Sequence, residues 1–229
     1  MSARVPVVAI DGPSGSGKGT ISRGVARALG WHWLDSGALY RLVALAAVKR
    51  GIAMTDAERL ADLAATMNAR FSDDGTRVTL DGVDVSDELR TESAGEAASQ
   101  VAVVAAVRAA LLAPQREFAR APGLVADGRD MGTVVFPDAL LKVFLTASSE
   151  ERATRRHKQL KEKGIDVSLP DLSSDIAQRD RRDASRSLAP LRPATDARVI
   201  DSTSLSPEEV IARVLTWLEA VGVRPKRAP

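Results

Sequence analysis

The chain has 229 residues, a formal net charge of +2 and no cysteine, which excludes disulfides, thiolate catalysis and zinc–thiolate sites. Its apolar fraction of 45% allows one α/β domain with a sizeable core, and the nearly balanced charge gives no general attraction to nucleic acids or membranes. We find no leader-like segment and no apolar run of membrane-spanning length, so we expect a soluble, cytoplasmic protein.

Short apolar strands and helices alternate along the chain. A strand at residues 7–11 is followed by a glycine-rich loop and a helix at 18–29. The other expected elements are strands at 33–35, 124–126, 140–145 and 199–200, helices at 37–50, 92–120, 149–163 and 175–186, a loop at 164–174, a final helix capped by Ser206 and Glu209, and a frayed tail at 224–229. This alternation predicts a five-stranded parallel sheet with helices on both faces and with ligands at the carboxyl ends of the strands.

The pattern changes at residues 69–85, where three short strands are separated by Asp-Gly pairs. Such pairs favour tight turns, so this segment predicts a small antiparallel meander. We therefore expect a single domain with three parts. A core at 1–59, 96–148 and 187–224 carries an inserted β subdomain at about 60–95 and a helical lid at about 149–186.

The glycine-rich loop has the composition and setting of a phosphate-binding loop of the P-loop NTPase type. It joins a strand to a helix, so its backbone N–H groups and the helix N-terminus can surround phosphate oxygens, and Lys18 adds a positive charge. The residues predicted to bind ATP here are Gly12, Pro13, Ser14, Gly15, Ser16, Gly17, Lys18, Gly19 and Thr20. This loop indicates an enzyme that transfers a phosphoryl group from ATP.

The residue after Lys18 departs from the common form of this loop. Gly19 stands where Ser or Thr usually offers a hydroxyl to Mg²⁺, and Thr20 follows one residue later. We expect Mg²⁺ to accompany ATP and to be held mainly by nucleotide oxygens and water. Thr20 and Asp127 are the candidates for contact through water. Asp127 can equally be an ordinary carboxylate at a strand end, and the sequence alone fixes no metal ligand.

Five segments together resemble the bacterial cytidylate kinases, a family of nucleoside monophosphate kinases. They are residues 12–20, 34–41, 98–102, 126–137 and 179–183, and the most distinctive part reads Asp-Gly-Arg-Asp-Met-Gly-Thr at 127–133. The likeness runs over about residues 5–220. It implies transfer of the γ-phosphoryl group of ATP to CMP or dCMP, a step of pyrimidine nucleotide metabolism. A kinase with UMP or AMP as acceptor is the nearest alternative.

The resemblance also implies roles for individual residues. Arg41 and Arg129 would hold the acceptor phosphate, Ser99, Arg108 and Asp130 would read the cytosine, Arg179 and Asp183 would contact the sugar, Arg186 would face the phosphates, and Ser36 and Tyr40 would line the acceptor pocket. The residues expected to act in catalysis are Lys18, Asp127, Arg129 and Arg186.

Arginines are concentrated in the predicted lid. Arg179, Asp183 and Arg186 have the spacing of one helix face, which suits a lid that closes on phosphates. Arg155 and Arg156 are predicted to reach ATP, but either can instead pair with a neighbouring glutamate, Glu150 or Glu151.

Ser99 and Arg108 set a geometric condition. Nine residues of continuous helix would place them on opposite faces, so they can meet one base only if the helix breaks near residues 103–106.

Two other classes of protein fit poorly. A GTPase would need an Asn/Thr-Lys-x-Asp motif, but no lysine has an aspartate two residues later, and the one asparagine is Asn68. An RNA-binding module would need aromatic platforms, and aromatic residues make up only 3% of the chain. We expect a monomer, because no surplus apolar helix face is evident.

Overall fold

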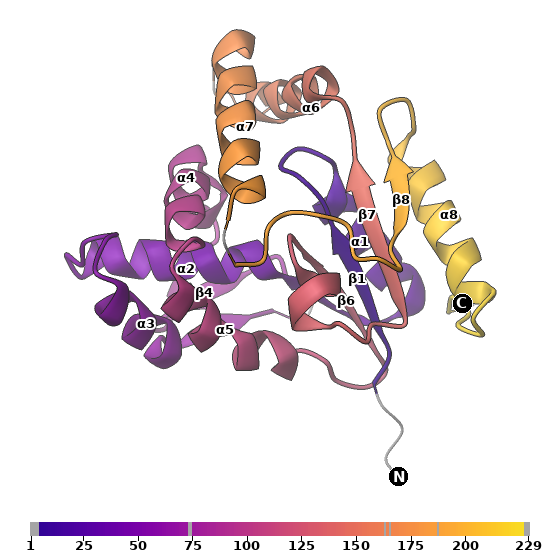
Figure 1. The fold of residues 1–229 in the computed structure, drawn as a ribbon, viewed down its shortest axis with the longest axis horizontal. Coiled ribbons are helices and arrows are strands. Elements are labelled where there is room, and N and C mark those ends of the chain that lie inside the picture. The colour runs from indigo at the N-terminus through magenta and orange to yellow at the C-terminus, as the bar shows by residue number, and fades with distance from the viewer. Residues whose placement is uncertain (1–4, 73–74, 163, 165, 187, 227–229) are drawn as a thin grey trace.

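A computed structural model of the chain describes residues 5–72, 75–162, 164, 166–186 and 188–226. Over these residues, a parallel sheet has the strand order β2 (His32–Asp35), β6 (Leu124–Gly128), β1 (Val7–Asp11), β7 (Leu141–Thr146) and β8 (Arg198–Asp201). The five-stranded parallel sheet predicted from the sequence is confirmed (Figure 1). Asp127 of β6 pairs in register with Ile10 of β1 and Asp35 of β2, so these three strands end level with one another.

Both faces of the sheet are covered because side chains alternate along each strand. Val8 and Ile10 of β1 pack with α1 (Lys18–Leu29) and α8 (Pro207–Glu219) on one face. Val7 and Ala9 belong to the core on the other face, which is covered by the helices α2 (Ser36–Lys49), α3 (Ala57–Thr66) and α5 (Ala105–Glu117). The sheet is therefore buried between two helical layers, as a parallel sheet requires.

The predicted meander is present as the antiparallel strands β3 (Ala69–Phe71), β4 (Val78–Leu80) and β5 (Val83–Asp84), followed by the short helix η1 (Glu88–Arg90). The turn between β4 and β5 is Asp81-Gly82, with φ of 51° and 83°, the positive values that a tight two-residue hairpin needs. Among the described residues, the apolar side chains of this insert form no separate core but join the cluster under α2 and α5.

The helical stretch at 92–120 breaks where the geometric argument required it. α4 (Glu92–Val101) and α5 are separated by three residues and meet at an angle of 106°.

Within the described residues, no single helix is long and apolar enough to cross a membrane. Only the bent pair of α4 and α5 has the length and composition of a membrane span.

The lid consists of α6 (Ser149–Glu162) and α7 (Leu169–Ala184), which stand above the carboxyl ends of the strands (Figure 1). The predicted loop at 164–174 and helix at 175–186 were placed too far along the chain. Ser168 caps α7 through its hydroxyl and a proline occupies the first turn, which is the start signal that the sequence interpretation overlooked.

At the C-terminus, the predicted capping box of Ser206 and Glu209 is confirmed. Part of the predicted frayed tail is held in place, since the N–H of Lys226 donates to the carbonyl of Ala28 at 2.9 Å. Residues 227–229, like Lys163 at the end of the predicted lid helix, lie outside the described residues.

Leu60→Ala tests how firmly the insert joins the core. Leu60 of α3 is fully buried, so we expect a loss of about 2–5 kcal/mol in the free energy of unfolding, measured by urea denaturation. Val83→Ala in the same insert is the control, because Val83 is 60% exposed and its loss should stay within about 0.5 kcal/mol. Equal, small losses in both variants would show that the insert unfolds separately from the sheet.

Candidate active site

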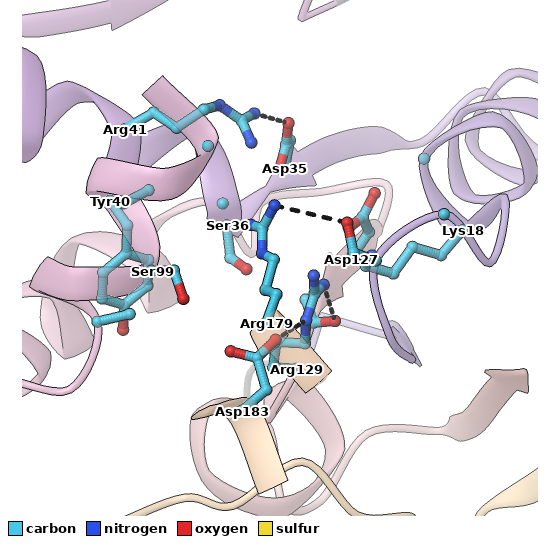
Figure 2. Close-up of a pocket in the computed structure, with 18 of the residues that line it drawn as sticks. Lys18, Asp35, Ser36, Tyr40, Arg41, Ser99, Asp127, Arg129, Arg179 and Asp183 are labelled. Atoms are coloured by element: carbon cyan, nitrogen blue, oxygen red, sulfur yellow. Dashed lines mark hydrogen bonds and ion pairs between the residues drawn. The ribbon is translucent and has the colours of Figure 1, made fainter. Parts of the chain in front are cut away.

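A cleft of about 350 Å³ opens at the carboxyl ends of β1, β2 and β6, next to the lid. It gathers most of the residues singled out in the sequence: Ser14, Gly15, Lys18, Gly19, Ser36, Tyr40, Arg41, Ser99, Arg108, Asp127, Arg129, Asp130, Arg156, Arg179, Asp183 and Arg186. Figure 2 shows Lys18 and Asp127 at one end of the cleft and Tyr40 and Ser99 at the other, with Arg129 and Arg179 between them. The lining is therefore cationic in the middle.

The phosphate loop keeps its shape through glycines and through bonds to its carbonyls. Gly17, with φ of 88°, precedes the first residue of α1, and a Cβ at Gly12 would lie 2.1 Å from the Leu145 carbonyl oxygen. The carbonyls of Ser14 and Ser16 accept hydrogen bonds from buried groups of the lid and of the segment after β8. The carbonyl oxygens that would repel an anion are thus hydrogen-bonded to other parts of the protein.

Lys18 is the cation of this loop. Its Nζ donates to the carbonyl of Pro13 at 3.1 Å, and burial, reinforced by the charge of Arg129, lowers its pKa to about 7. An anion bound beside Lys18 would favour its charged form. Asp127 lies close by and accepts from the Ser22 hydroxyl at 3.1 Å. Burial and the charge of Asp35 raise the Asp127 pKa to about 6.

Asp35, the last residue of β2, holds two parts of the structure together. One carboxylate oxygen caps α2 by accepting from the N–H of Ala38 at 3.2 Å, and the other pairs with Arg41 at 2.5 Å. Burial raises the pKa of Asp35, but the charge of Arg41 outweighs this effect and the pKa is lowered. The remaining Nε of Arg41 is buried without a partner among the described residues, which leaves a donor for a bound anion.

The lid contributes a second carboxylate that holds arginines. Asp183 is 1% exposed and pairs with Arg129 at 2.9 Å and with Arg186 (Figure 2 shows the first pair). Burial raises the Asp183 pKa, but the charges of Arg129 and Arg186 lower it overall. The predicted helical stripe is only partly correct, because α7 ends at Ala184. Arg186 lies beyond the helix and still reaches the cleft.

Arg179 completes the cationic centre. Its guanidinium lies 3.5 Å from the Ser14 hydroxyl of the phosphate loop, which it approaches from the lid. Burial, followed by the charge of Arg129, lowers the Arg179 pKa to about 10. The Nε atoms of Arg179 and Arg186 are buried without partners in the described part of the chain. Crowded cations with unused donors are what a site for phosphate groups presents before its ligand binds.

The far end of the cleft offers polar groups suited to a planar ring. The break before α5 turns Arg108 toward Asp130, and the two side chains form an ion pair. The Ser99 hydroxyl is buried without a partner among the described residues, and the Tyr40 ring lies 5.9 Å from the Arg108 guanidinium carbon. A negative acceptor therefore stands next to a positive donor. Arg129, the residue before Asp130, pairs with Asp183 instead, so among the described residues the ion-pair partner of Asp130 is Arg108.

Comparison with known proteins decides the family. The family model described as "Cytidylate kinase" matches residues 8–220. A cytidylate kinase of Nitrosococcus oceani is 56% identical over 95% of this chain and 98% of its own length, and one of Pseudomonas paraeruginosa is 57% identical over 97% and 99%. The chain belongs to the cytidylate kinase family. Among solved structures, a gluconokinase from Sinorhizobium meliloti matches 94% of this chain and 93% of its own at 17% identity and a TM-score of 0.49.

The family resemblance stated from the sequence is thus confirmed, and it raises the question of where Mg²⁺ would fit. The carboxylates of Asp35 and Asp127 face the cleft near Lys18, and the Cβ of any side chain at Gly19 would lie 3.4 Å from Asp127 Oδ2. Among the described residues, no group of three His, Cys, Asp or Glu side chains could hold a metal alone. The donor set fits an ion that arrives with nucleotide oxygens and water. Thr20 is exposed and lies outside the cleft lining.

The two lid arginines that the sequence could not rank point to different places. Arg155 pairs with Glu151 at 2.7 Å, as one alternative allowed, and also donates to the Ser202 carbonyl behind the phosphate loop. Arg156 lines the cleft and pairs with Glu92 of α4. Some predicted ATP-binding residues do not line the cleft: Arg155, and in the loop Gly12, Pro13, Ser16 and Gly17.

Asp35 and Asp11, which lie in and beside the site, were not among the predicted site residues. Asp35 could have been found from its position, since an aspartate between a strand and a Ser-Gly helix start is a common cap. Asp11, at the end of β1, gives no such signal, because its partners lie 120 residues away or more.

Asp183→Asn tests the arrangement of charges around the lid. The neutral amide would leave Arg129 and Arg186 as buried, uncompensated cations, so we expect a loss of about 3–5 kcal/mol in the free energy of unfolding of the ligand-free protein. Added phosphate should restore more stability to this variant than to the wild type. Asp175→Asn, at an exposed position of the same helix, is the control for thermal and urea unfolding. Equal losses in the two variants would contradict the assigned role.

Proposed function

We propose that this chain transfers the γ-phosphoryl group of ATP to CMP or dCMP, giving ADP and CDP or dCDP. The observation that carries the proposal is the content of one cleft. A phosphate loop with Lys18 lies at one end, the Arg108–Asp130 pair lies at the other, and a cluster of arginines lies between them. A donor phosphate, a transferring phosphoryl group and an acceptor nucleotide all find complementary charge along this line. The test is a panel of CMP, dCMP, UMP and AMP with ATP, in which UMP or AMP as the best acceptor would overturn the assignment.

The reaction asks the protein for position and charge rather than covalent chemistry. The phosphate loop and Lys18 hold the donor, while Arg41 and Arg129 hold the acceptor phosphate so that its oxygen faces the γ-phosphorus in line. Arg179 and Arg186 of the lid neutralise the charge that spreads over the transferring oxygens. Their unpaired Nε donors point to this role. Closure of the lid removes water, which would otherwise compete as the acceptor.

Mg²⁺ bound with ATP would add neutralisation at the donor phosphates, with Asp127 and its neighbour Asp35 supplying negative charge behind the water shell. Burial and the charge of Asp35 raise the pKa of Asp127, and a cation bound nearby would favour the charged form of this carboxylate.

The acceptor base is read by the pair at the far end of the cleft. Cytosine offers an amino donor at position 4 beside a ring nitrogen that accepts, and the Asp130 carboxylate and the Arg108 guanidinium present the complementary order. Uracil reverses both groups, so it would meet acceptor against acceptor and donor against donor. Asp183 and Arg179 lie where the sugar would join base and phosphate, and Ser99 adds a free hydroxyl.

Lys18→Ala is expected to lower kcat by at least about 10²–10³-fold while the melting temperature stays close to that of the wild type. The variant lacks the charge that faces the transferring group. Its fold should persist because the lysine side chain contributes only one hydrogen bond here, to the Pro13 carbonyl. Lys49→Ala, which removes an exposed lysine paired with Glu88, is the control and should leave kcat unchanged. Near-normal turnover of the Lys18 variant would remove the phosphate loop from the mechanism.

Asp130→Asn is expected to reduce the preference for CMP over UMP. The loss of the charged acceptor weakens cytosine binding and relieves the repulsion of uracil, and a contact pair of this kind is worth about 1–3 kcal/mol of discrimination. The measurement is kcat/KM for both acceptors at saturating ATP. If both values fell by the same factor, Asp130 would be a structural residue, and the reading of cytosine would have to be assigned to other groups.

A further inference from the structure

The helical turn that follows β6 is capped by a side chain from another strand. This turn, η2 (Met131–Val135), begins directly after Asp130. The N–H groups of its first two residues, Met131 and Gly132, donate to the two carboxylate oxygens of Asp11, each at 2.8 Å. Asp11 is the last residue of β1 and is 5% exposed.

Asp130 is the residue that would ordinarily cap this turn. It occupies the position before the first helical residue, where aspartate is among the preferred capping residues. Over the described residues its side chain makes no capping bond, and its carboxylate pairs with Arg108 across the cleft. To cap the turn itself, the same carboxylate would have to fold back toward the N–H groups that Asp11 now occupies.

The surroundings of Asp11 are built for this contact. Asp11 pairs in register with Gly128, so its side chain lies beside the segment that leaves β6. A Cβ at Gly132 would stand 3.4 Å from Asp11 Oδ2, an ordinary packing distance, so Asp11 lies directly against the start of the turn. Burial raises the Asp11 pKa to about 7 although both N–H bonds lower it, so the two bonds compensate only part of the cost of burying this carboxylate.

We infer that Asp11 is a positioning residue for the acceptor base: it caps the turn in place of Asp130 and so keeps the Asp130 carboxylate on Arg108. The inference rests on the base-reading role proposed above for Asp130. It also means that the strand leading into the phosphate loop fixes the residue that reads the acceptor. Asp11 itself is not among the residues that line the cleft.

Asp11→Asn is the test variant, because the amide has the same shape but accepts only one of the two N–H groups. The second N–H then attracts the Asp130 carboxylate. We expect kcat/KM for CMP to fall about five- to tenfold, mainly through KM, with UMP little changed, which is the size of effect one capping bond supports. The KM for ATP should stay the same. If kcat/KM for CMP and for UMP fell by the same factor, so that their ratio stayed unchanged, the inference would be overturned.

The double variant Asp11→Asn/Asp130→Asn separates action through Asp130 from a general disturbance. If Asp11 acts through Asp130, its replacement changes the CMP/UMP ratio in the wild type but not in the Asp130→Asn background. A further loss of ratio in the double variant would overturn the proposed route. Asp196→Asn is the matched control, since Asp196 is exposed and holds Lys142, which also packs on Gly132. It should leave the ratio unchanged.

A crystal structure of Asp11→Asn makes failure of this inference distinguishable from failure of the proposed base reading. We expect the Asp130 carboxylate to bond to N–H groups of its own turn, whatever its part in catalysis. A carboxylate that remains on Arg108 would overturn the capping exchange even if Asp130→Asn collapses selectivity. If the Asn variant does not fold, Asp11→Ser, whose hydroxyl can accept one N–H, is used in the same assays with the same criteria.

Discussion

The structure depends on holding several positive charges in one buried cleft before any nucleotide is bound. Burial, together with the charge of Arg129, lowers the pKa of both Lys18 and Arg179, so this arrangement of cations is unfavourable by itself. Carboxylates make it tolerable: Asp35 holds Arg41, and Asp183 holds two further arginines. Each arginine retains donors for a phosphate. The carboxylates therefore fix the cations in position without using up their capacity to bind.

The strand order places these charges where they are needed. β6 lies between β2 and β1, so the segments after three strands distant in sequence leave the sheet side by side. The glycine-rich loop with Lys18 follows β1, Ser36 and Arg41 follow β2, and Arg129 with Asp130 follow β6. The donor and acceptor sites proposed above would therefore be set by one sheet edge. Under that proposal, movement can be confined to α6 and α7.

Signals within short stretches of the sequence were enough to predict most of this arrangement. They could not predict the contacts between segments that are distant in the sequence. The phosphate loop, the strands and the break before α5 follow from glycine spacing, apolar runs and the requirement that Ser99 and Arg108 meet. The turn at Met131–Val135 could not be predicted, because its first N–H groups bond to Asp11 rather than to a local cap. Arg155 and Arg156 could not be distinguished for the same reason, since their partners lie on β8's following segment and on α4.

The ion pairs that join α6 and α7 to α4 are half-exposed and weak, which suits the opening of the lid that the proposed reaction requires. Arg156 pairs with Glu92 and Arg182 with Glu96, so α6 and α7 both reach α4 through ion pairs. The glutamates are about half exposed, at 50% and 49% of their side chains, and pairs of this exposure contribute about 0–1 kcal/mol each. The more buried pairs, Arg129–Asp183 and Asp183–Arg186, line the cleft, where the phosphate groups of the proposed substrates would compete for the same arginines. Under the proposed function, nucleotide binding and release would therefore change the ion pairs that hold α7, while the sheet edge beneath it stays fixed.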